Sequence, residues 1–119
     1  MNFHATTPHQ VKLLDGRNVV IEVRKRISPR ELRAIIQNGI DTAAVITAFT
    51  SRRPDWIDEV NRDSLGSLSN LCLLRAVEVM KKNPSDPTLS AALENLYAAK
   101  RFKTELDARL NQQPATQPR

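Results

Sequence analysis

The chain has 119 residues, of which 40% are hydrophobic and 26% are charged, values typical of one soluble domain. Its net charge of +5 at pH 7 is compatible with a nucleic-acid partner, although the basic residues form no long basic arm. The single cysteine, Cys72, excludes an internal disulfide, and no apolar run approaches the roughly 18 residues that a membrane-spanning helix needs. We therefore expect a protein without membrane contact that stays in the cytoplasm.

A hairpin is predicted near the N-terminus. Residues 1–9 are polar and contain a proline, so we expect a flexible leader there. Asp15-Gly16 then separates two apolar runs, and glycine accepts the positive φ of a tight turn. One face of the second strand is apolar: Val19, Ile21 and Val23. Because a two-stranded hairpin is marginal alone, this face must pack on helices or pair with another copy or a partner.

Helix-start signals follow the hairpin. Ser28 suits an N-cap, Pro29 the first helical position and Glu31 the last residue of a capping box, so a helix is predicted from residue 29. Asp41 predicts a second helix in the same way. A short helical turn comes next, and its tryptophan, Trp56, is expected to pin that turn to the core.

The two remaining helices are longer. The first, predicted over residues 63–82, is apolar on so many sides that it is expected to be central in the fold. The second begins at Asp86 and Pro87. Its apolar residues recur at steps of three to four, with Ala99 as the alternative to Phe102: Leu89, Leu93, Leu96, Phe102, Leu106 and Leu110. This seam lasts about 22 residues, or about 33 Å at 1.5 Å per residue. It is either the buried face of a core helix or a projecting surface for self-association.

These patterns predict an α+β fold that is mostly α. The N-terminal hairpin is followed by a four- to five-helix bundle with a long C-terminal helix. Residues 10–110 are expected to form one domain, and the proline-containing residues 111–119 a disordered tail.

The sequence contains no arrangement typical of an enzyme. It has no glycine-rich phosphate loop, no pair of cysteines and no helix with paired histidines. Both histidines, His4 and His9, lie in the expected leader. We therefore expect a binding protein that is not an enzyme and has no catalytic residue, metal or cofactor.

Two stretches carry a family resemblance. Residues 14–23, LDGRNVVIEV, followed by residues 27–32, ISPREL, resemble the opening of tail assembly chaperones of tailed bacteriophages. The second stretch is RPDWIDEV at residues 53–60, followed by a leucine-rich helix ending VEVMKKNP at residues 77–84. The likeness covers Val11–Pro84 and rests on pattern rather than on any rare residue.

The resemblance implies a small helical protein that binds the tape measure protein or tail subunits in the host cytoplasm during virion assembly. It also implies that the protein can form homo-oligomers. The expected contact residues are those of the two apolar faces: Val19, Ile21, Val23, Leu89, Leu93, Leu96, Phe102 and Leu106. The chain differs from many such chaperones in being basic, which leaves another virion assembly protein as an alternative.

Two further hypotheses stay open. The first is a small basic DNA-binding regulator, in which residues 28–38 and 41–50 form a helix-turn-helix with its turn at residues 38–40. Its phosphate contacts would be basic residues near those helices: Arg24, Lys25, Arg26, Arg30, Arg33, Arg52 and Arg53. The second is a small inhibitor or adaptor encoded by a mobile element, which no residue pattern separates from an assembly factor.

Overall fold

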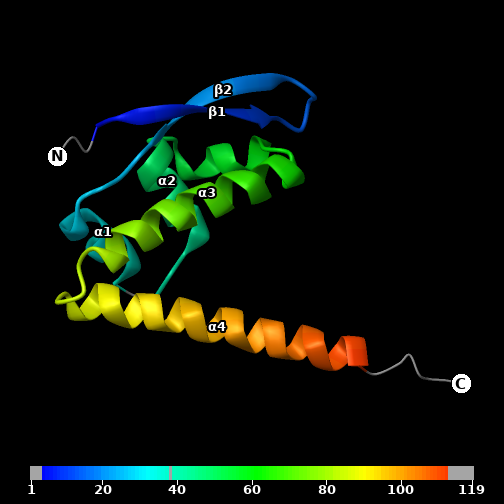
Figure 1. Ribbon diagram of the computed structural model, residues 1–119. Helices are drawn as coiled ribbons and strands as arrows, with labels where there is room; N and C mark the ends of the chain where they lie inside the picture. Colours follow the sequence, from blue (N-terminus) through cyan, green and yellow to red (C-terminus); the bar gives the residue numbers. More distant parts are fainter. Residues whose placement is uncertain (1–3, 38, 113–119) are drawn as a thin grey trace, which may run out of the picture.

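The computed structural model describes residues 4–37 and 39–112, and it confirms an α+β fold that is mostly α (Figure 1). An antiparallel hairpin comes first and the helices follow, the last of them the longest. The elements in chain order are β1 (Thr6–Lys12), β2 (Asn18–Arg24), α1 (Pro29–Ile36), α2 (Thr42–Thr50), the 3-10 helix η1 (Pro54–Glu59), α3 (Arg62–Lys81) and α4 (Pro87–Gln112).

The hairpin is longer than the sequence indicates. Its first strand begins at Thr6, so the expectation of a loose leader over residues 1–9 is wrong for residues 6–9. The reason is pairing across the sheet: Thr6 lies opposite Arg24, and the Lys25 N–H donates to the Ala5 carbonyl at 2.8 Å. His9 lies opposite Ile21 and is half-buried rather than freely solvated. Residues 1–3 lie outside the described part of the chain.

The turn of the hairpin forms as predicted. Gly16 has a φ of +92°, a conformation that glycine adopts without steric cost. The Asp15 carboxylate accepts from the Arg17 backbone N–H at 3.0 Å and from its Nε at 2.7 Å. These two hydrogen bonds stabilise the tight turn by joining Arg17 to Asp15 on either side of Gly16.

The two edges of the hairpin differ. At the β1 edge, residues 59–61 form a bridge: Leu14 N–H donates to the Glu59 carbonyl and Asn61 N–H to the Lys12 carbonyl, both at 2.8 Å. Pro8 also lies on this edge and has no N–H to offer. The β2 edge is open, because within the described residues no hydrogen bond reaches the outward backbone groups of Val20 or Glu22.

The helices cover one face of the hairpin, which lies across α2 and α3 (Figure 1). Val11, Ile21 and Val23 point to that side and are at most 2% exposed. They join the main core, whose largest fully buried side chain is Phe49 of α2. Trp56 is 9% exposed, which confirms that it pins η1 to the core.

Arg75 of α3 fastens the helix layer to the hairpin. Its Nη1 donates to the carbonyls of Val23 at 3.0 Å and Arg24 at 2.8 Å, and its Nη2 donates to Thr7 Oγ1 at 2.7 Å. One side chain therefore bonds to both strands. The half-buried guanidinium meets three neutral acceptors, so charge-assisted hydrogen bonds replace its hydration.

The predicted caps are present at the helix starts. Ser28 Oγ accepts from Glu31 N–H at 3.1 Å and Asp41 Oδ1 from Ala43 N–H at 3.0 Å. The Glu31 carboxylate, however, does not turn back to Ser28 as in a capping box. It binds Arg24 Nη1 at 2.8 Å and Nη2 at 3.2 Å, because a bidentate ion pair is stronger than a bond to a neutral N–H.

Cys72 lies in the centre of α3 and is fully buried, as its apolar neighbours indicate. Burial raises the pKa of its thiol to about 11, so only about one molecule in a thousand carries the thiolate at pH 8. We expect iodoacetamide to leave the native protein unmodified at that pH and to alkylate Cys72 in guanidinium chloride. Mass spectrometry measures both reactions, and equal rates in the two conditions would contradict the burial.

Candidate protein-binding surfaces

The apolar face of the hairpin is mostly buried and is not available to a partner. Ile21 is 2% exposed and Val23 is 0% exposed, while Val19 is half-buried beside them. The expectation of an exposed contact residue is therefore wrong for Ile21 and Val23, while Val19 stays partly accessible. Alternation identifies the apolar face of a strand, but α2 and α3 of the same chain already cover that face.

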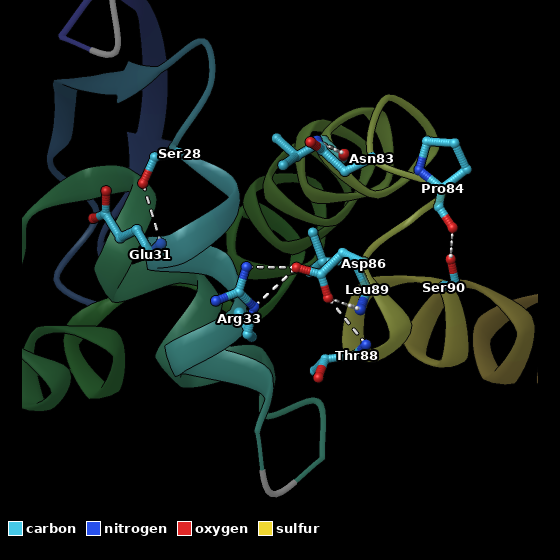
Figure 2. Close-up of polar contacts among 10 residues, drawn as sticks. Ser28, Glu31, Arg33, Asn83, Pro84, Asp86, Thr88, Leu89 and Ser90 are labelled. Carbon is cyan, nitrogen blue, oxygen red and sulfur yellow. Dashed lines mark hydrogen bonds and ion pairs between the residues drawn. The ribbon is translucent and has the colours of Figure 1, made fainter.

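The first turn of α4 is held firmly to α1 (Figure 2). Asp86 Oδ1 accepts from the N–H groups of Thr88 at 3.0 Å and Leu89 at 3.2 Å, which confirms it as the N-cap. Its other oxygen, Oδ2, accepts from Arg33 Nε at 2.9 Å and Nη2 at 2.6 Å. Ser90 Oγ donates to the Pro84 carbonyl at 2.8 Å. The same carboxylate thus starts α4 and fixes its position relative to α1.

This junction predicts a dependence of stability on pH. The Arg33 guanidinium, and next the Leu89 N–H, hold the pKa of Asp86 below its ordinary value of 3.8. A lowered carboxyl pKa stabilises the fold above the unfolded-state pKa, and that stabilisation disappears as pH falls through the folded-state value. We expect Asp86→Asn, which keeps a cap, to lower Tm near neutral pH.

The measurement is Tm by circular dichroism for both proteins between pH 7 and pH 2.5. The gap between wild type and Asp86→Asn should be constant above about pH 5 and should close below pH 3.8. Asp55→Asn is the matched control, because that exposed carboxylate lies 3.6 Å from Arg53, whose side chain is even more exposed. A gap that persists unchanged at pH 2.5 would contradict the assignment.

Contact with the body of the protein diminishes along α4. Leu89 is 0% exposed, whereas Leu93 and Leu96 are only partly covered. The expectation of an exposed contact residue is therefore wrong for Leu89, because it packs in the core beneath α1 and α3. Tyr97 is 44% exposed, and residues 98–100 are exposed as well.

The helical backbone continues well past this point. It runs to Gln112, and Figure 1 shows its C-terminal half extending away from the other helices. The side chains of Phe102 and Leu106 lie outside the described part of the structure. The prediction of a disordered tail over residues 111–119 fails for 111 and 112, which are helical, and residues 113–119 lie outside the described residues.

An open groove of about 610 Å³ lies between α4 and the end of α1. The apolar side chains along it come from both helices and from the loop between α1 and α2: Ile36, Ile40, Ala91, Ala92 and Leu96. The groove follows the covered end of α4 and leads toward its exposed part. The sequence could not reveal it, because Ile36 and Leu96 are far apart along the chain.

The helix-turn-helix geometry does not support DNA recognition. The second helix of such a motif must present side chains to the major groove. Here α2, with the sequence TAAVITAFT, contains no cation, and Val45, Ile46, Phe49 and Thr50 are buried. Within this helix, Thr42 alone is exposed. The helix that would read the bases is thus a core helix.

Most of the expected phosphate-binding arginines are engaged within the chain. Arg24 pairs with Glu31 at 2.8 Å and Arg33 with Asp86 at 2.6 Å. The Arg52 guanidinium lies 5.0 Å from the centroid of the Trp56 ring, a cation–π contact. Arg53 lies 3.6 Å from Asp55. Of the seven residues of that hypothesis, Lys25, Arg26 and Arg30 alone lack such a contact within the described part of the chain.

Comparison of the chain with protein-family models, curated proteins and solved structures finds no match. Among the described residues, no three His, Cys, Asp or Glu side chains are grouped so that they could hold a metal ion. No helix within the described ranges has the length and apolar character required to cross a bilayer.

Proposed function

We propose that the protein is an assembly factor that binds another protein through α4 and the groove beside it, and that it acts as a tail assembly chaperone on the tape measure protein of a tailed bacteriophage. The class of function is supported by α4, and the partner is supported by the resemblance of Val11–Pro84 to such chaperones. The proposed place of action is the host cytoplasm.

The observation that carries the proposal is that α4 continues far beyond Leu96, the last of its described residues that packs against the core. From Tyr97 to Gln112 the helix extends by about 24 Å at 1.5 Å per residue. Its sequence there still contains Phe102, Leu106 and Leu110 at helical spacing. A helical segment of this length is marginal in water by itself, because tertiary packing supplies most helix stability. A partner helix, or a second copy of the chain, would supply that packing.

The proposal predicts that the C-terminal half of α4 is needed for partner binding. The test is bacterial co-expression of the full chain with a phage tape measure protein, followed by measurement of the soluble fraction and of co-purification. We expect the double substitution Phe102→Ser and Leu106→Ser to weaken association more than tenfold, because loss of central apolar anchors costs about 2 kcal/mol or more.

Ala108→Ser is the matched control, since Ala108 is an exposed residue of the same helical segment. Circular dichroism must show that all variants keep the fold. Light scattering on the chain alone measures homo-oligomers separately. Equal solubility of the tape measure protein with the double variant and with wild type would contradict the proposed function.

A further inference from the structure

A second pocket lies at the opposite end of α3 from the hairpin turn. It has a volume of about 420 Å³ and is formed by the segment between β2 and α1 and by the last turn of α3. Its apolar lining consists of Ile27, Pro29 and Val79, of which Ile27 is 1% and Val79 is 6% exposed. This volume is within the range of about 300–1,000 Å³ that is common for ligand sites.

The rim of this pocket is strongly cationic. Lys25, Arg26, Arg75 and Lys82 line it, opposed by the Glu78 carboxylate alone. Arg75 is already bonded to the hairpin. In the part of the chain that the structure describes, Lys25, Arg26 and Lys82 have no carboxylate within ion-pair distance. Within those residues, the charged groups of these three side chains also make no hydrogen bond that would tie them into the fold.

We propose that this pocket binds an acidic peptide segment of a partner protein, with a large apolar side chain of that segment packed on the half-buried Pro29, above the buried Ile27 and Val79. Carboxylates of the segment would pair with Lys25, Arg26 and Lys82 around it. Charge complementarity determines the chemistry of the partner, and the apolar lining adds the requirement for an anchor residue. The site is separate from α4 and does not depend on the function proposed for that helix.

A nucleic acid suits this pocket less well. Phosphate contacts use cations but gain nothing from an apolar floor, and Glu78 would repel a phosphate. Binding of unpaired bases relies on aromatic side chains for stacking, and none is present among the described residues that line the pocket. An acidic segment with an apolar anchor uses both features of the site.

The test is fluorescence anisotropy with the full chain and a short fluorescein-labelled peptide in which glutamates flank a central Leu-Phe pair. We expect saturable binding that weakens as salt is raised, because exposed charges contribute to it. Exchange of the Leu-Phe pair for two serines should raise Kd about tenfold. Equal Kd values for the two peptides would overturn the proposal, as would absence of binding at low salt.

Two substitution pairs locate the site. Lys25→Gln with Lys82→Gln, both at exposed positions, should raise Kd about tenfold. The matched control is Lys12→Gln with Arg62→Gln, which changes net charge equally but lies at the other end of α3, about 30 Å away. The control pair should leave Kd unchanged, and equal effects of the two pairs would overturn the assignment.

Nuclear magnetic resonance provides a second measurement. Titration with the peptide should shift the methyl signals of Ile27 and Val79 and leave that of Val20 on the hairpin unchanged. A duplex DNA oligonucleotide serves as the competing ligand. DNA binding that shifts the same signals at lower Kd than the peptide would replace the acidic peptide with a nucleic acid as occupant. Loss of peptide binding would leave co-purification with the tape measure protein through α4 unaffected, so the two proposals can fail independently.

Discussion

Replacement of Phe49 by alanine is expected to lower the free energy of unfolding by about 3–5 kcal/mol. Phe49 is 0% exposed and is the largest of the fully buried side chains. It belongs to α2, which packs against both α3 and β2. Alanine at this position would remove the ring and leave a cavity between the hairpin and the helices, which could close only partly because three elements frame it.

Urea denaturation followed by circular dichroism measures this loss. Domains of this size have a total stability of about 5–15 kcal/mol, so the variant should lose a large share of it and unfold at a clearly lower urea concentration. Leu74→Ala is the control, because Leu74 is 65% exposed and its truncation should change stability by less than about 0.5 kcal/mol. A loss below about 1 kcal/mol for Phe49→Ala would show that this residue is not central to the core.

Replacement of Arg75 by methionine should have the second largest effect. Methionine keeps the apolar stem of the side chain but removes the guanidinium that bonds to Val23, Arg24 and Thr7. Because hydrogen bonds that involve a charged group contribute about 1.5–3 kcal/mol, we expect stability to fall by about 2–4 kcal/mol. The acceptors left without a donor belong to both strands, so the hairpin should loosen before the helices do.

Amide hydrogen exchange tests this order directly. In Arg75→Met, exchange in β1 and β2 should accelerate more than exchange in α3. Arg75→Lys should restore only part of the stability, since an ammonium group cannot reproduce the planar fork of the guanidinium. Arg62→Met, at an exposed position of the same helix, is the control. Uniform acceleration across all elements would show that Arg75 supports the whole fold and is no specific link to the hairpin.

Local signals in the sequence predict most of the secondary structure. Ser28, Asp41 and Asp86 each cap the helix expected of them, because a cap depends only on the two or three residues that follow it. The Asp15-Gly16 turn forms for the same reason. The start of β1 was not predictable in this way, since Pro8 argues against a strand and residues 6–9 become one through pairing with β2.

The candidate surfaces depend on contacts that no local pattern contains. The strand periodicity identifies Ile21 and Val23 as one face, but only the packing of α2 and α3 decides that this face is covered. The pair Arg33–Asp86 joins residues 53 positions apart, and the contacts of Arg75 reach 51 to 68 positions. The cationic pocket likewise combines Lys25 with Lys82. Such arrangements follow from the three-dimensional fold alone.

The unequal edges of the hairpin limit how strand addition could proceed. An added strand could pair with the outward backbone groups of Val20 and Glu22 in β2. The β1 edge is obstructed by Pro8 and by the bridge from residues 59–61. Two molecules joined through their β2 strands would therefore display only their obstructed β1 edges at the ends of the combined sheet. Growth by this route would stop at a pair, because neither outer edge of that sheet would offer an unobstructed row of backbone groups.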